Sequence, residues 1–344
     1  MQGSRFDSLL SSEPFRNAHG VMCMPKAAHS HKIPVKDYDF TKNLSVDELI
    51  SQMDAAWGFT AGKLAAGVSI MEAMVNAKGC TKFLSFTADI VATGTRGVIR
   101  ELVKHKLVDV LITTCGTLDH DVARCFRDYY KGSFIMNDSK LHHEGINRLG
   151  NVLVPNDSYG IVIEQKILPM LEQLYKEGKK ELSTIELCRE IGLHVCNESS
   201  ILYWAAKNDI PIVVPGPTDG SVGYQLWFFS QDHKDFRVNI LKDEEYLNNL
   251  VFDSKKSGAL IVGGGISKHH TIWWNQFKDG LDYVVYISTA DEWDGSLSGA
   301  RPREAVSWGK ISEKAKRVMI EGDATMVLPI MTSALLERLK KKKN

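Results

Sequence analysis

The stretch "VDVLITTCG" at residues 108–116 sets the expected fold class. It is a short, nearly continuous apolar run rich in β-branched residues. It ends in small turn residues and is followed by the amphipathic segment "LDHDVARCFRDYY". A run of this kind is typical of a strand buried on both faces, as in a parallel sheet covered by helices.

The same alternation recurs along the chain from residue 81 onward, while residues 44–79 and 158–208 have mostly helical patterns. The pattern predicts a doubly wound, mainly parallel α/β sheet with a Rossmann-like site and an N-terminal helical layer. We expect residues 1–40 to be an arm and residues 41–344 to be a single domain. The other predicted strands are "KFLSF" (82–86), "IPIVVPG" (210–216), "FRVNIL" (236–241), "GALIVGGG" (258–265), "YVVYIST" (283–289) and "KRVMIEG" (316–322).

Composition limits which partners the chain can bind and in which cellular compartment we expect it. The 42 basic and 42 acidic residues balance, so no global field attracts nucleic acid or an anionic membrane. Six cysteines without a CxxC pair argue against structural zinc, and we expect no metal site. With no apolar run of membrane-spanning length and no signal-peptide core, the chain is expected to be soluble and cytoplasmic.

Small and acidic residues follow the predicted strands, where parallel sheets bind ligands. Small residues let backbone amides approach a ligand, and Asp219 or Asp323 could accept hydrogen bonds from ribose hydroxyls. The triple glycine at 263–265 taken alone fits a tight strand-to-helix turn equally well. Six loops with small or acidic residues follow predicted strands, and together they predict a dinucleotide site, although a standard GxGxxG motif is absent.

The segment "EAVSWGKI" (304–311) contains a candidate nucleophile. Pro302 suits a helix start, Glu304 and Trp308 would share one helix face, and Gly309 would end the helix. Lys310 would then lie just beyond the helix, where its amine could turn into a cleft. Desolvation beside Trp308 would favour the neutral amine that forms Schiff bases. An ordinary solvated lysine stays an open alternative.

Two further groups fit amine chemistry. His269 and His270 follow the triple glycine at a predicted helix start, so either could be a neutral base or merely cap the helix. Trp293, Asp294 and the Glu304–Trp308 pair offer carboxylates and aromatic faces, which a polyamine would need.

These motifs resemble the deoxyhypusine synthase family. The resemblance covers roughly residues 40–337 in the same order, and its "EAVSWGK" motif is highly specific. "HHTIWWNQFKDG" and "GSLSGA" resemble archaeal members more than eukaryotic ones. The remaining matching motifs are "VDVLITTCGTLDHD", "HHEGINRLGNVLVPNDSY", "PGPTDGSVG", "GGGISKHH", "YVVYISTADEWDGSLSGARPREAVSWGKI" and "EGDATMVLPIM".

The resemblance implies NAD-dependent transfer of the aminobutyl group of spermidine to one lysine of the translation initiation factor 5A precursor. It implies that Lys310 carries the imine, that His269 acts as a base, and that four copies assemble as a dimer of dimers with active sites at dimer interfaces. The implied substrate-binding residues are Asp119, His120, Tyr224, Asp294, Gly295, Ser296, Leu297, Glu304 and Trp308. The implied NAD-binding residues are Ala88, Asp89, Thr114, Cys115, Gly116, Asp219, Gly264, Thr289, Ala290, Asp323 and Ala324.

The chain departs from the eukaryotic pattern at several positions. His120, Tyr224 and Leu297 stand where eukaryotic members carry acids, and Asp89 and Trp273 stand where they usually carry Asn. We therefore expect one end of the amine pocket to be more apolar, with Asp89, Asp119 and Asp294 holding the ammonium groups. The alternatives are aminobutyl transfer to a free amine, as in homospermidine synthase, and a non-catalytic NAD-binding subunit of a hetero-oligomer.

Overall fold

Six parallel strands form the central sheet. The computed structural model describes residues 33–342 of the chain. Counted in chain order, the six strands have the spatial order 6-5-4-1-2-3, which is the order of dinucleotide-binding doubly wound folds. The predicted fold class is therefore confirmed. The strands are β1 (Cys80–Phe86), β2 (Val110–Ile112), β7 (Ile212–Val213), β9 (Lys256–Val262), β10 (Leu281–Ser288) and β11 (Ile311–Glu321).

The winding direction reverses between β1 and β9, which pair in parallel along their whole lengths, from Cys80 opposite Lys256 to Phe86 opposite Val262. Chain segments leave these two strands toward opposite edges of the sheet. Their carboxyl ends therefore leave a crevice, the usual ligand site of such folds.

Apolar side chains alternate between two cores on opposite faces of the sheet. On β1, Leu84 and Phe86 belong to one core and Phe83 to the other; on β10, Val285 and Tyr286 divide in the same way. Both faces are buried, which explains why the strands read as nearly continuous apolar runs.

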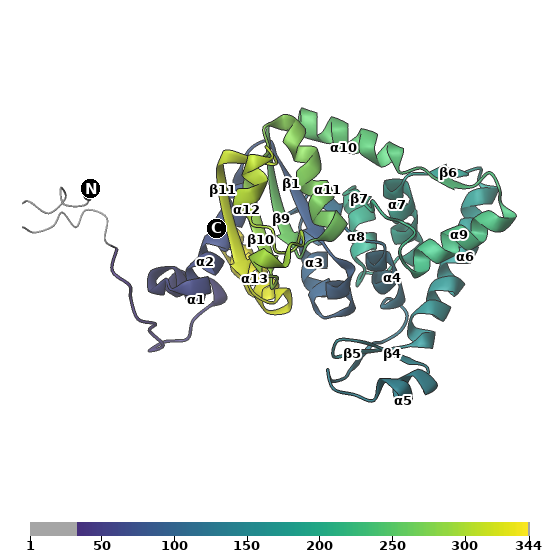
Figure 1. Cartoon of the computed structure of the whole chain (residues 1–344), viewed down its shortest axis with the longest axis horizontal. Helices are drawn as coiled ribbons and strands as arrows, with labels where there is room; N and C mark the ends of the chain where they lie inside the picture. The colour runs from purple at the N-terminus through teal and green to yellow at the C-terminus, as the bar shows by residue number, and fades with distance from the viewer. Residues whose placement is uncertain (1–32, 343–344) are drawn as a thin grey trace, which may run out of the picture. The chain divides into compact units, whose positions relative to one another are not determined.

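Helices from distant parts of the sequence cover the two faces (Figure 1). The first face packs against α2 (Phe59–Asn76), α3 (Thr95–Lys104) and α13 (Ala324–Lys341). The second face packs against α10 (Leu241–Asp253), α11 (Gly265–Asn275) and α12 (Pro302–Ser307).

The remaining elements extend this framework. The helices are α1 (Val46–Ala56), α4 (Gly116–Ala123), α5 (Asp138–His143), α6 (Gly160–Lys176), α7 (Thr184–Val195), α8 (Ile201–Asn208) and α9 (Ser221–Asp232). A three-stranded antiparallel sheet contains β3 (Tyr130–Lys131), β5 (Val152–Pro155) and β4 (Ile146–Leu149), and a two-stranded sheet pairs β6 (Glu181–Leu182) with β8 (Arg237–Val238).

One predicted strand lies outside the central sheet. Residues 236–241 supply only β8, which pairs with β6. The segment alternates apolar side chains with Arg237 and Asn239, a pattern that suits a partly exposed strand rather than one buried on both faces. The helical patterns at 44–79 and 158–208 correspond to helices, as predicted.

Residues from Asp37 onward cluster as one compact unit. Most of the predicted arm lies outside the described residues, so the arm and the domain boundary at residue 41 stay predictions. Between residues 33 and 342, no helix is long and apolar enough to cross a membrane.

Candidate active site

A cavity of about 470 Å³ opens at the carboxyl ends of β1, β9, β10 and β11. We call it the switch-point cavity, because it includes the ends of β1 and β9. Five of the predicted cofactor residues line it: Asp89, Thr289, Ala290, Asp323 and Ala324. The turn at residues 149–152, between β4 and β5, contributes a further wall.

The other predicted cofactor residues are not among the described residues that line this cavity: Ala88, Thr114, Cys115, Gly116, Asp219 and Gly264. The Thr114 hydroxyl accepts a hydrogen bond from the Ala88 amide at 3.1 Å, which ties the ends of β2 and β1 together. A side chain on Gly116 would come within 2.9 Å of the Ala88 Cβ. Cys115 is buried and donates to the Pro217 carbonyl at 3.1 Å, in the loop that leads to Asp219.

Gly264 is required by a close approach of two loops. A Cβ at this position would lie 2.6 Å from the Ser298 backbone nitrogen and 2.5 Å from its Cα. Any larger residue would push the loop of residues 295–300, which we call the partition loop, away from the start of α11.

The charge of the switch-point cavity is acidic. Asp89, Asp294 and Asp323 line it, and none of its described lining residues is a lysine or arginine. Asp323 is also the N-cap of α13 and accepts a hydrogen bond from the Thr325 amide at 2.8 Å. Small side chains, backbone amides and acids that could accept hydrogen bonds from ribose hydroxyls fit a dinucleotide, whose pyrophosphate would rely on main-chain donors and helix N-termini.

A second cavity, of about 300 Å³, contains Lys310. We call it the Lys310 cavity. Four residues predicted from sequence to act with Lys310 also line it: His269, Leu297, Glu304 and Trp308. The structure thus brings together residues from α11, the partition loop and α12. Sequence reasoning did not assign a role to four other lining residues, Lys268, Trp273, Tyr286 and Arg301.

The turn after α12 directs Lys310 inward. Gly309 has φ 68°, its amide donates to the Val306 carbonyl at 2.9 Å, and the Lys310 amide donates to the Ala305 carbonyl at 3.0 Å. These are the two hydrogen bonds of a Schellman motif, as the sequence predicted for Gly309. Lys310 is only 8% exposed, so it is not the solvated lysine of the alternative interpretation.

The Lys310 ammonium lies among aromatic rings. Its Nζ is 5.1 Å from the centroid of the Trp308 ring and 5.9 Å from that of Trp273. Among residues 33–342, no carboxylate lies within ion-pair distance of Lys310.

His269 lies in the second turn of α11, because the helix begins at Gly265. The alternative that the two histidines merely cap the helix is therefore wrong. The His269 ring stacks on Trp273 with 5.6 Å between centroids. Burial, and then the positive charge of Lys310, lower the pKa of His269. A neutral imidazole beside Lys310 can accept a proton.

Asp119, His120 and Tyr224, three of the predicted substrate residues, line neither the Lys310 cavity nor the switch-point cavity of their own chain. Asp119 is fully buried and accepts hydrogen bonds from the Ser221 and Val222 amides at 2.8 and 2.7 Å, so it caps α9. His120 is buried against Tyr129. Tyr224 is 55% exposed on α9.

Asp294, directly before the partition loop, and Gly295 and Ser296, at its start, are exposed. Asp294 and Ser296 line the switch-point cavity. The Ser296 amide donates to the Asp294 carboxylate at 2.7 Å, and hydrogen bonds from Ser296 lower the pKa of that carboxyl. Trp293, 83% exposed, does not line either cavity.

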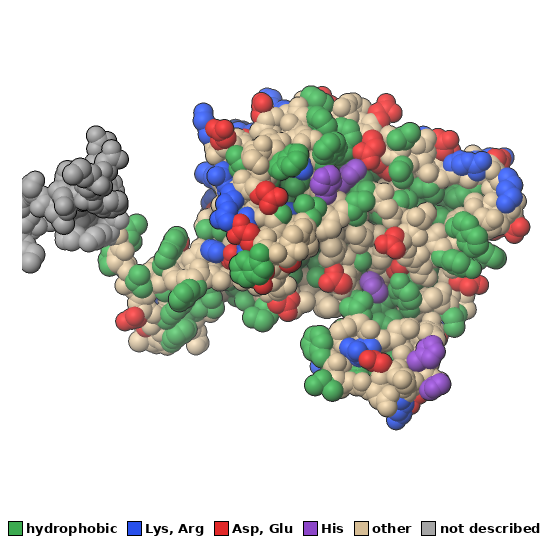
Figure 2. Space-filling view, viewed as in Figure 1, with side chains coloured by type: hydrophobic (Ala, Val, Ile, Leu, Met, Phe, Trp, Pro, Cys, Tyr) green, Lys and Arg blue, Asp and Glu red, His purple; other side chains and the backbone are tan. Residues whose placement is uncertain are grey.

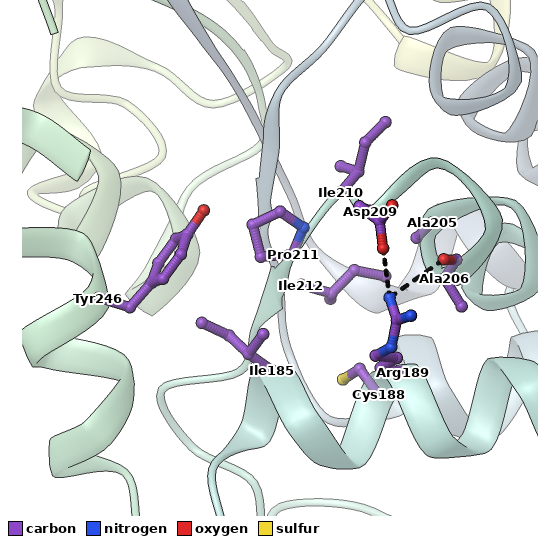
Figure 3. A pocket seen from close by; sticks show the side chains of 10 residues that line it. All are labelled: Ile185, Cys188, Arg189, Ala205, Ala206, Asp209, Ile210, Pro211, Ile212 and Tyr246. Carbon is purple, nitrogen blue, oxygen red and sulfur yellow. Dashed lines mark hydrogen bonds and ion pairs between the residues drawn. The ribbon is translucent and has the colours of Figure 1, made fainter. Parts of the chain in front are cut away.

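A third cavity lies beside the amino end of β7, between α7, α8 and α10 (Figure 3). Its wall is mainly apolar, and Arg189 at its edge is paired with Asp209 at 2.6 Å. It is remote from the carboxyl ends of the strands and contains none of the predicted site residues.

Comparison with known proteins decides the family. Residues 48–335 match the family model of deoxyhypusine synthase. The chain belongs to the deoxyhypusine synthase family. A relative from Picrophilus torridus named "probable deoxyhypusine synthase" is 56% identical over 89% of this chain and 98% of its own length. One of the same name from Thermoplasma volcanium is 57% identical over 88% and 97%.

The crystal structure of a provisionally assigned deoxyhypusine synthase from Entamoeba histolytica shares the fold. It has a TM-score of 0.60 and 22% identity over 88% of this chain and 97% of that one. The predicted resemblance to the deoxyhypusine synthase family, including its archaeal members, is confirmed by these matches.

Proposed function

We propose that this deoxyhypusine synthase family member transfers the aminobutyl group of spermidine to one lysine of the translation initiation factor 5A precursor. The observation that carries the proposal is Lys310, buried beside Trp308, His269 and Glu304 in the Lys310 cavity. The alternatives of a free-amine acceptor and of a non-catalytic subunit are separated by experiment below.

The described residues fit NAD as the cofactor. Asp89 and Asp323 suit ribose hydroxyls, and the small residues at 289–290 let main chain approach the ligand. When bound, NAD supplies an acceptor for a hydride from the amine and a donor that returns it at the end of the reaction.

The protein residues then have separate roles. Lys310, as a neutral amine, attacks the oxidised carbon of spermidine; its nitrogen forms the new C=N bond and 1,3-diaminopropane leaves with its nitrogen. His269 accepts the proton that Lys310 loses and returns one to the leaving amine. The acceptor lysine displaces Lys310 in the same way. Glu304 pairs with an ammonium group, and Trp308 packs against the methylenes.

The amine would span both cavities. Among residues 33–342, Glu304 is the one carboxylate that lines the Lys310 cavity, whereas Asp89 and Asp294 line the switch-point cavity. Leu297, half-buried on the wall of the Lys310 cavity, suits the methylene chain. We infer that the acids at the two ends of this path fix the positions of the terminal ammonium groups.

We also infer a homotetramer in which a second copy completes each site. Asp119, His120 and Tyr224 do not line the Lys310 cavity of their own chain. Partly exposed aromatic side chains support this inference: Trp273 and Trp308 at the cavity, and Tyr224, Trp227 and Phe228 on α9. Figure 2 shows hydrophobic side chains exposed among charged ones. The free cysteines and a translation-factor acceptor favour the cytoplasm.

The test incubates the protein with NAD and spermidine, reduces it with borohydride and maps adducts by mass spectrometry. We expect one aminobutyl mass on Lys310, lost in Lys310→Ala and retained in the exposed control Lys316→Ala. The absence of an adduct on Lys310 would contradict the imine mechanism and favour a non-catalytic subunit. Purified factor precursor and putrescine, offered separately as acceptors, distinguish the protein substrate from a free amine.

A further inference from the structure

Lys268 is a fully buried lysine in the wall of the Lys310 cavity. It is 1% exposed, on α11, one residue before His269. Lysines are almost never buried to this extent unless their charge is satisfied. The proposed reaction uses Lys310 as nucleophile and leaves Lys268 without a role.

The Lys268 ammonium is satisfied by the main chain of the partition loop. Its Nζ donates to the Leu297 carbonyl at 2.7 Å and to the Ala300 carbonyl at 2.8 Å. It also lies 4.1 Å from the centroid of the Tyr286 ring. Among residues 33–342, no carboxylate is within ion-pair distance of it, so these contacts hold the charge.

The partition loop separates the two cavities. Ser296 and Ser298 line the switch-point cavity, whereas Leu297 and Ala300 line the Lys310 cavity. Gly264, at the start of α11, lets the loop approach closely from one side. Lys268 holds the same loop through two carbonyls three residues apart.

The two lysines of this cavity differ in their contacts. Lys268 Nζ is committed to two acceptors, whereas no hydrogen bond within residues 33–342 involves Lys310 Nζ. Burial lowers the pKa of Lys268 to about 8, with Glu304 opposing the shift, so the amine stays mostly protonated at pH 7. A protonated, doubly hydrogen-bonded amine is a donor and not a nucleophile.

We propose that Lys268 is a positioning residue that fixes the partition loop between Lys310 and the cofactor site. It acts through the carbonyls of Leu297 and Ala300, and so sets the path along which one amine reaches both cavities. The inference rests on the proposed function, but the loop contact is testable without it.

The test compares Lys268→Met, Lys268→Arg and the exposed control Lys256→Met in the full chain. Hydrogen exchange of the peptide 290–301 reports loop order, and turnover of spermidine with NAD reports the reaction. Methionine keeps an apolar chain of similar length but cannot donate. We expect faster exchange and a loss of kcat of about tenfold to a hundredfold, because small displacements at a reacting centre have effects of this size.

Lys268→Arg should restore both readouts to near wild type, because a guanidinium can donate to both carbonyls. If the arginine variant does not fold, hydrogen exchange and turnover are measured instead in Lys268→Gln, whose amide has two N–H donors. Unchanged exchange in Lys268→Met, or a folded donor variant as impaired as Lys268→Met, would overturn the proposal. So would a borohydride-trapped adduct on Lys268. A wild type without aminobutyl transfer would refute the proposed function, while hydrogen exchange would still decide whether Lys268 holds the loop.

Discussion

At the scale of the residue, His120 shows how burial changes what a side chain does. His120 is 8% exposed, and its Nδ1 lies 2.9 Å from the Tyr129 hydroxyl. Burial, and then the charge of Arg124, lower the pKa of His120 to about 4. The folded protein therefore keeps this imidazole neutral over a pH range in which the unfolded chain takes up a proton.

The pH dependence of stability follows from this difference. Because the folded pKa of about 4 lies below the ordinary 6.5, the unfolded state binds more protons between these values. The contribution of His120 to the free energy of unfolding should fall as pH drops from 6.5 through 4, by about 3 kcal/mol in all. Urea unfolding from pH 4 to 7 should give a flatter curve for His120→Gln, but not for the exposed control His194→Gln. Parallel curves for wild type and His120→Gln would contradict the assignment.

Sequence reasoning found residues with unusual local context and missed those defined only by packing. Glu304, Trp308 and Lys310 lie within seven residues, so their relation was visible in the chain. Lys268 and Tyr286 come together only because α11 packs on the face of the sheet to which Tyr286 points, and a lysine in "GGISKHH" carries no sign that it will be buried. His120 looked like a substrate residue by resemblance, and its burial was not readable from the sequence.

At the scale of the element, the joint between α12 and β11 determines where Lys310 points. Pro302 begins α12 and Gly309 ends it, as the sequence predicted. The left-handed turn at Gly309 reverses the chain within two residues, so that Lys310 leads into β11 with its side chain in the cavity. By contrast, the sequence placed the strand at residues 236–241 in the central sheet, whereas β8 pairs with β6. A period-two pattern does not say which sheet a short strand joins.

Gly309→Ala should affect both stability and activity. Its φ of 68° strains any residue with a Cβ, although the space around it is open, so the cost is a backbone cost of about 1–2 kcal/mol. Gly178, with φ 85° and open surroundings, is a matched control. Both alanine variants should lower the free energy of unfolding similarly. Only Gly309→Ala should also lower kcat, because it alone redirects Lys310. Equal turnover in the two variants would show that this turn does not set the nucleophile's position.

At the scale of the whole molecule, the pattern of apolar runs predicted the class of fold but not its strand order. Six runs correspond to the six central strands, yet order 6-5-4-1-2-3 depends on how helices pack between them. The sequence also did not show that the predicted substrate residues lie apart from one another within one chain. Asp119 and Tyr224 precede Lys310 in one continuous family pattern, but their own chain places them outside the Lys310 cavity.

A site shared between two copies predicts complementation between inactive variants. Tyr224→Arg changes an exposed residue of α9 and would repel an ammonium group, whereas Lys310→Ala removes the proposed nucleophile. Each variant alone should be inactive. In a randomly co-assembled mixture, about a quarter of the sites would combine an intact Lys310 from one copy with an intact Tyr224 from another, and should regain about a quarter of wild-type turnover.

The control for this experiment joins both substitutions in one chain and mixes that chain with wild type. Such mixed assemblies also keep about a quarter of their sites intact by random pairing, so the two mixtures should agree. If the two single variants stay inactive after co-assembly, Lys310 and Tyr224 must act from the same copy, and the chain would have to change its fold around α9 to bring them together. If Tyr224→Arg alone keeps full turnover, Tyr224 does not contact the amine in any copy, and the exposed aromatic face of α9 serves assembly alone.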